Sequence, residues 1–166
     1  MKKLLVATIL GVGLWVGASK AASAADFYYI GSSDNDHITI LDPSTISTAP
    51  GGNKIFHLAE ISEFTLWADT GIEVDCIGNR ARMISIVTHM TGGDAMDLSS
   101  MNSDVNVWHA LVTGLKVDGA DLVQTSALVC KYPGEKPTGD DVLTFPDFQS
   151  ILERISNVIE KNQNGK

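Results

Sequence analysis

The stretch IEVDCIGNRARM, residues 72–83, predicts a β-hairpin and with it the character of the fold. Apolar and acidic side chains alternate in its first half, as they do in a strand with one buried face. Gly78-Asn79 is typical of a two-residue hairpin loop, which would place Asp75 opposite Arg82. We therefore expect Cys76 to face the core, and Asp75 and Arg82 to form an ion pair on the other face.

The segments on both sides of this hairpin extend the predicted sheet. Turn-forming residues separate apolar and β-branched runs, as they do between antiparallel neighbours. Strands are predicted over 27–30, 37–41, 54–67 and 80–90, the third with a bulge or bend near 60–63. Residues 94–104 predict a polar loop. Residues 120–130 fit a helix or a strand, because a short apolar run does not distinguish the two.

The C-terminal segment has the clearest pattern. Apolar side chains recur at helical spacing at Phe148, Ile151, Leu152, Ile155, Val158 and Ile159. Thr144-x-x-Asp147 resembles a capping box, so a helix is expected over about 147–161. We expect a β domain over 25–132, a Pro- and Gly-rich linker over 133–143, and a unit over 144–166 whose helix packs on that domain or on a partner. A partner in the form of a second subunit leaves a homodimer open.

The N-terminal segment has the features of a secretory signal peptide over 1–24. Lys2 and Lys3 precede an apolar run, and Ala22-Ser23-Ala24 supplies small residues at a cleavage site. The apolar run is short for a membrane span, and no later run is long enough, so we expect no span after cleavage. No Cys lies near the cleavage site, so we expect no lipoprotein. The chain is therefore predicted to be exported, and periplasmic or secreted.

The predicted export bears on whether the two cysteines form a disulfide. In an oxidising compartment Cys76 and Cys130 have only each other to pair with, and the alternative is two free thiols. The absence of a C-x-x-C spacing favours a structural disulfide. The predicted fold is α+β: a small antiparallel β-sheet domain with one disulfide and a C-terminal amphipathic helix.

Composition narrows the function classes. The 166 residues carry a formal net charge of −8 and are 44% hydrophobic, which indicates a folded acidic protein. Removal of residues 1–24 takes away three Lys and no acidic residue, which brings the charge to −11. A strongly acidic surface argues against nucleic acid as a partner.

Motifs for catalysis or metal binding are absent from the sequence. The four histidines, none of them in a ligand-type spacing, are His37, His57, His89 and His109. Asp34-Asn35-Asp36 begins like a calcium loop but lacks its later Gly and Glu, and no G-x-S-x-G elbow occurs. We therefore expect no enzyme, no catalytic residue, no cofactor and no metal site.

Several of these segments together resemble the surface-adhesin E family, also called protein E-like. The resemblance covers about residues 26–132. Its pieces are Phe27-Tyr28-Tyr29-Ile30-Gly31, Ile40-Leu41-Asp42-Pro43-Ser44-Thr45-Ile46, Glu73-Val74-Asp75-Cys76 with Arg80 and Arg82, Trp108, and Leu128-Val129-Cys130. The resemblance implies a small antiparallel β domain, a Cys–Cys bridge, exposure outside the cytoplasm and a binding role.

Two functions follow as hypotheses. The resemblance favours a non-enzymatic, adhesin-like protein that binds extracellular ligands, with a host matrix or serum protein as partner. The net charge favours a periplasmic inhibitor or immunity-type protein that binds a basic enzyme, because a negative surface attracts a cationic partner.

Overall fold

The structure is a computed structural model, and it describes residues 25–33, 37–62, 67–90, 94–112, 116–117, 120–134, 137 and 142–164. The predicted signal peptide, the Asp34-Asn35-Asp36 segment and the side chain of His37 lie outside the described part. No helix among the described residues is both long and apolar enough to cross a membrane.

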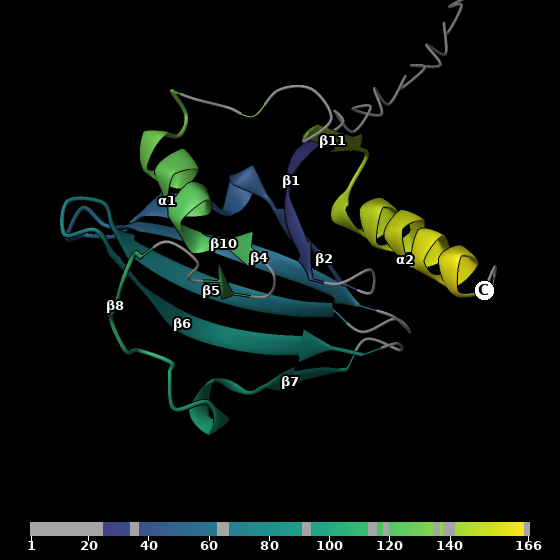
Figure 1. The fold of residues 1–166 in the computed structure, drawn as a ribbon, viewed down its shortest axis with the longest axis horizontal. Coiled ribbons are helices and arrows are strands. Elements are labelled where there is room, and N and C mark those ends of the chain that lie inside the picture. The colour runs from purple at the N-terminus through teal and green to yellow at the C-terminus, as the bar shows by residue number, and fades with distance from the viewer. Residues whose placement is uncertain are drawn as a thin grey trace, which may run out of the picture.

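Nine strands of the described chain form one antiparallel sheet, ordered β11-β1-β2-β4-β5-β6-β7, with β3 paired to β4 and β8 to β6 (Figure 1). The strands are β1 (Ala25–Ser33), β2 (His37–Leu41), β3 (Ser47–Thr48), β4 (Lys54–Ser62), β5 (Trp67–Asp75), β6 (Arg80–His89), β7 (Ala95–Asp97), β8 (His109–Ala110) and β11 (Val142–Phe145). Two short strands, β9 (Lys116–Val117) and β10 (Ala120–Asp121), pair separately. The helices are η1 (Pro43–Thr45), η3 (Ser99–Met101), α1 (Leu122–Lys131) and α2 (Phe148–Asn164).

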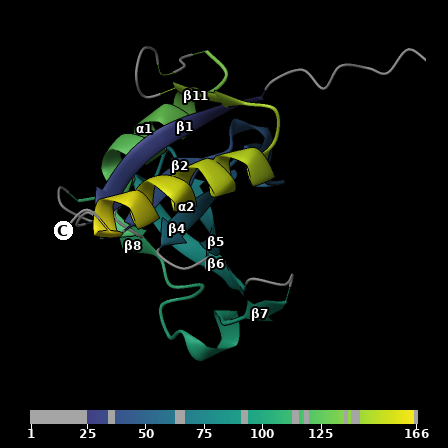
Figure 2. The same cartoon turned by 90° about the vertical axis from the view of Figure 1, so that its right-hand side faces the viewer.

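Each face of the sheet has its own apolar core beneath one helix (Figure 2). Neighbouring residues on one strand point to opposite faces, so Phe27 packs on the α2 side and Tyr28 on the α1 side. The α1-side core contains Tyr28, Leu41, Phe56, Leu58, Ile72, Val74, Ala81, Leu122 and Val129. The α2-side core contains Phe27, Ile40, Ala59, Ile61, Ile151 and Ile155. The predicted antiparallel sheet with a C-terminal helix is confirmed.

The structure settles the open choice for residues 120–130. Ala120–Asp121 form the short strand β10, and the residues from Leu122 on form α1. The first turn of α1 is capped by Asp121, whose Oδ1 accepts the N–H groups of Val123 and Gln124 at 2.9 and 3.2 Å. Leu122 and Val129 are buried against the sheet. Asp121 is a helix N-cap residue, and its presence indicates that a helix begins here. The spacing of apolar residues alone does not give this information.

The C-terminal helix α2 begins after Asp147, whose Oδ1 accepts the N–H of Ser150 at 2.8 Å. The predicted capping box is wrong in its first member. Thr144 lies in β11, and its hydroxyl donates to the Asp26 carboxylate at 3.0 Å. The helix packs on the α2-side core through Ile151 and Ile155.

The β5–β6 hairpin has the predicted strands but a longer turn. Asp75 pairs with Arg80, so four residues, Cys76 to Asn79, form the connection in place of two. The Asp75 Oδ1 accepts the N–H of Gly78 at 2.7 Å, and Asn79 has a φ of 50°, in the left-handed region that Asn tolerates. This side-chain bond closes a wider turn than the Gly-Asn pair alone predicts.

The disulfide between Cys76 and Cys130 is confirmed, with a Cα–Cα distance of 5.8 Å. It joins the β5–β6 turn to the last turn of α1. The expectation that Cys76 faces the core is wrong: Cys76 is exposed, because it lies in the longer turn rather than on the strand.

Three other segments differ from their predictions. The single strand predicted over 54–67 is two antiparallel strands, since β4 ends at Ser62 and β5 begins at Trp67. The predicted polar loop over 94–104 contains β7, which pairs with β6. The predicted linker over 133–143 overlaps β11, which pairs with β1 and so belongs to the sheet.

Candidate functional site

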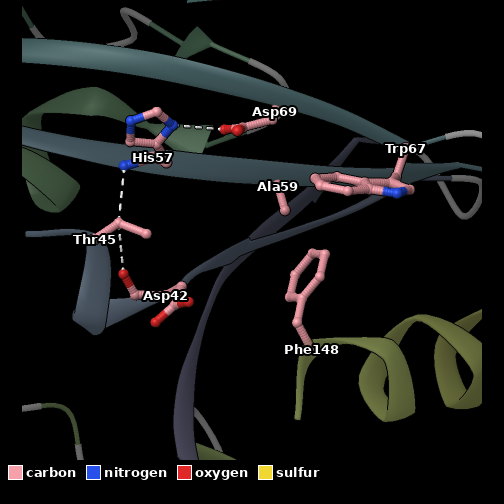
Figure 3. A pocket seen from close by; sticks show the side chains of 7 residues that line it. All are labelled: Asp42, Thr45, His57, Ala59, Trp67, Asp69 and Phe148. Carbon is pink, nitrogen blue, oxygen red and sulfur yellow. Dashed lines mark hydrogen bonds and ion pairs between the residues drawn. The ribbon is translucent and has the colours of Figure 1, made fainter. Parts of the chain in front are cut away.

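A cavity of about 430 Å³ opens on the α2 side of the sheet, where β4, β5, η1 and the start of α2 meet (Figure 3). Its lining combines aromatic rings with acidic and imidazole groups. The lining residues are Asp42, Thr45, His57, Ala59, Trp67, Asp69 and Phe148.

The register of β4 and β5 brings the cavity residues together. Ala59 lies opposite Asp69, and Ile61 lies opposite Trp67, so alternate residues of both strands share the α2 face. His57, two residues before Ala59 on β4, is then the diagonal neighbour of Asp69.

His57 and Asp69 form the central polar contact of the cavity. Nδ1 of His57 lies 2.8 Å from Oδ1 of Asp69, and their side chains are 37% and 30% exposed. The hydrogen bond to Asp69 raises the pKa of His57 above its usual value; burial opposes this shift, while the charges of Asp69 and Asp42 add to it. The other ring nitrogen lies on the side of the imidazole away from Asp69 (Figure 3).

Replacing Asp69 by Asn should lower the pKa of His57, because the amide accepts a hydrogen bond without a negative charge. The contribution of protonated His57 to the free energy of unfolding is complete at pH values below its unfolded-state pKa of about 6.5. This contribution is lost as the pH rises through the raised pKa of the folded state. The wild type should therefore lose unfolding free energy across that window, and Asp69→Asn should lose less. NMR titration of the ring protons measures the pKa, and urea unfolding at pH values on both sides measures stability.

Asp104→Asn is the matched control for this experiment. Asp104 is exposed and lies outside the cavity lining, and the substitution removes the same charge. The His57 pKa should stay at its wild-type value there. An equal pKa in wild type and Asp69→Asn would contradict the role of this hydrogen bond.

The η1 turn forms the second polar wall of the cavity. Thr45 Oγ1 donates to the backbone carbonyl of Asp42 at 2.7 Å and accepts the backbone N–H of His57 at 3.1 Å. The Asp42 carboxylate accepts the N–H of Ser44 at 2.8 Å through Oδ1. The Thr45 hydroxyl therefore ties η1 to β4 and is engaged as donor and as acceptor.

Aromatic rings form the opposite wall. Trp67 stacks on His89 with centroids 3.9 Å apart and planes 3° apart, and it meets Phe148 at 4.8 Å with planes at 63°. Phe148 also contacts Phe27 of the core at 6.0 Å between centroids. The first residue of α2 is thus both a core contact and a wall of the cavity.

A second polar cluster lies near the hairpin end of the sheet and corrects the predicted ion pair. Arg82 contacts Glu73 at 2.6 Å, and Asp75 contacts Arg80 at 3.0 Å, so Asp75 and Arg82 are not partners. The four-residue turn shifts the register by two, which puts Glu73 opposite Arg82. Both guanidinium groups lie over the Trp108 ring, at 4.7 and 4.8 Å from its centroid.

Glu73 is the most buried acid of this second cluster, at 8% exposure. Hydrogen bonds from Asn53 and then Arg82 hold its pKa below the usual range, against the opposing effect of burial. The two ion pairs of this cluster, Glu73–Arg82 and Asp75–Arg80, each join β5 or its end to β6 across the hairpin.

Comparison of the chain with protein-family models, with curated proteins and with solved structures finds no match. Within the described ranges, no three His, Cys, Asp or Glu residues lie close enough together to hold a metal ion. The cavity was not among the sequence-predicted sites. The sequence would have indicated the cavity if His57-x-Ala59 and Trp67-x-Asp69 had been assigned to two paired strands, because residues two apart on a strand face the same side.

Proposed function

We propose that this protein is an exported, non-enzymatic, adhesin-like binding protein that recognises extracellular protein ligands. The observation that carries the proposal is the composition of the cavity. It is open to solvent and lined by aromatic rings and charged groups that are already held in place by neighbours. Such a lining suits the capture of a side chain from a partner.

The hydrogen bonds of the cavity favour binding over catalysis. Covalent catalysis needs a nucleophile within hydrogen-bond reach of its base. Among the described lining residues Thr45 alone has a hydroxyl group, and that hydroxyl donates to a carbonyl and accepts a backbone N–H. Its proton is therefore directed at Asp42 and away from the His57 imidazole.

The disulfide supports the proposed export. Bridges such as Cys76–Cys130 persist in oxidising compartments and are rare in the cytosol. Together with the signal-peptide pattern of residues 1–24, this supports a periplasmic or secreted protein. The resemblance to the surface-adhesin E family supports the binding role.

The charge distribution favours a second candidate function, a periplasmic inhibitor or immunity-type protein that binds a basic enzyme. The chain has a net charge of −8, and two carboxylates, Asp42 and Asp69, line the cavity. A basic partner would be attracted over distances larger than a contact.

Binding kinetics separate the two functions. The oxidised protein without residues 1–24 is immobilised and exposed to purified extracellular-matrix and serum proteins, and separately to purified basic periplasmic enzymes. An adhesin-like protein should bind members of the first set, with association rates that change little with salt. An inhibitor should bind one enzyme, with an association rate that falls steeply as the screening length drops to about 8 Å and below.

Ovalbumin, which belongs to neither set, is passed over the same surface as the control for unspecific adsorption. Failure of every purified protein in both sets would overturn the proposed binding function. Reproducible turnover of a hydrolase substrate that His57→Ala abolishes would overturn its non-enzymatic character.

A further inference from the structure

We infer that the cavity between β4, β5, η1 and α2 is the ligand site, and that it takes a Lys or Arg side chain of the protein ligand. This inference rests on the proposed binding function and names the group that the site recognises. The argument uses the two walls of the cavity, its size and its charge.

The polar wall favours a cation. Asp42 and Asp69 supply two carboxylates, whereas His57 is the one basic group among the described lining residues. Asp69 receives one hydrogen bond from His57 and Asp42 one from Ser44, and each carboxylate has further lone-pair sites. Ammonium and guanidinium groups form short, charge-assisted hydrogen bonds with such oxygens, while an anion would meet two like charges.

The aromatic wall favours a cation on an apolar stem. Trp67 and Phe148 border the cavity on the side facing the carboxylates (Figure 3). Lys and Arg bury their methylene stems along apolar surfaces, and their charged groups are attracted to aromatic faces within about 6 Å. The stacking on His89 fixes the orientation of Trp67 before a ligand arrives, which lowers the entropic cost of binding.

The volume agrees with this occupant. At about 430 Å³ the cavity lies in the range of small-ligand pockets, about 300–1,000 Å³, so a long side chain enters with part of its backbone.

Cation binding at this site should depend on pH. The charged groups that face His57 are Asp69 on β5 and Asp42, the residue before η1. Protonation of His57 offsets one of these carboxylates, so cation binding should weaken as the pH falls through the raised pKa of His57.

The test uses capped amino acids as probes. N-acetyl-lysine methylamide and N-acetyl-arginine methylamide are titrated into the oxidised protein, with the Trp67 indole and His57 ring signals followed by NMR. N-acetyl-norleucine methylamide, with a similar stem and no charge, is the matched control probe. Butylammonium chloride, which has the alkyl stem and the charge but no peptide groups, tests whether the site prefers a small alkylamine to an amino-acid side chain.

At least one of the cationic side-chain probes should shift both signals saturably and bind at least about fivefold more tightly than the norleucine probe, which corresponds to about 1 kcal/mol. Equal binding of the norleucine probe would show an apolar pocket and overturn the inference. Tighter binding of butylammonium than of both side-chain probes would assign the site to free amines. The absence of any saturable shift would also overturn the inference.

Charge-removing variants locate the interaction. Asp42→Asn and Asp69→Asn should each weaken binding of the lysine probe by about fivefold, the effect of about 1 kcal/mol, whereas Asp104→Asn should leave it unchanged. Near-ultraviolet circular dichroism checks that each variant is folded. If Asp69→Asn does not fold, Asp42→Asn alone decides, because Asn retains the Oδ1 that caps η1.

The failure of this inference and of the proposed function give different results. A protein ligand that binds wild type and the folded Asp42→Asn variant equally tightly would overturn the cavity as its site and leave the binding function standing. A cavity that binds the lysine probe, in a protein that binds no purified protein, would overturn the binding function.

Discussion

Reduction of the Cys76–Cys130 bond should lower the free energy of unfolding by about 4 kcal/mol. The two cysteines are 54 residues apart, and in the chain-entropy model a bridge of this span restricts the unfolded chain by about that amount. For a domain of this size the melting temperature should fall by more than about 10 °C. Urea and thermal unfolding with and without reductant measure both quantities.

The double variant Cys76→Ser, Cys130→Ser is the control for the reductant. It should have the stability of the reduced wild type, and adding reductant should change it no further. Thiol titration under denaturing conditions completes the test. Two free thiols in the protein before reduction would contradict the bridge.

Ile151→Asp should destabilise the protein by more than the about 2–5 kcal/mol that deletion of a buried Ile side chain costs. Ile151 is fully buried between α2 and the sheet, in the core that contains Phe27 and Ile40. A carboxylate there also loses its hydration without gaining a partner. Urea unfolding measures the loss, and hydrogen exchange should show the amides of α2 losing protection first.

Val158→Asp is the matched control, because Val158 is on the same helix and 42% exposed. It introduces the same charge and the same helix propensity and should cost much less. If Ile151→Asp and Val158→Asp were equally stable, with equal protection of α2, the helix would not be docked as the structure has it.

The faces of residues 72–75 of the hairpin were predictable from the sequence, whereas the exposed turn position of Cys76 and the cross-strand pairs were not. Alternation along residues 72–75 places Ile72 and Val74 in the α1-side core, with Glu73 and Asp75 on the other face. The actual turn shifts the expected register by two residues, which preserves the faces because side chains alternate with a period of two. The same shift exchanges the partners, so Arg82 meets Glu73 and Asp75 meets Arg80.

The cavity was out of reach of the sequence for a different reason. The residues between β4 and β5 are Glu63-Phe64-Thr65-Leu66, which contain no Gly, Pro, Asn or Asp to indicate a reversal of the chain. In the single strand predicted over 54–67, His57 and Trp67 would lie far apart along the strand. The observed pairing places Asp69 beside His57, and Phe148 comes from a helix whose docking position no local pattern specifies.

The pairing of β1 with β11 has a consequence for how the protein is made. Ribosomes extend the chain from its N-terminus, so β1 exists while the residues that will cover its outer edge are still untranslated. An uncovered strand edge is a template for unwanted pairing, which gives chaperones a reason to hold the nascent chain. Because Phe148 follows β11, a polypeptide released before that point would carry an uncapped sheet and an unfinished cavity.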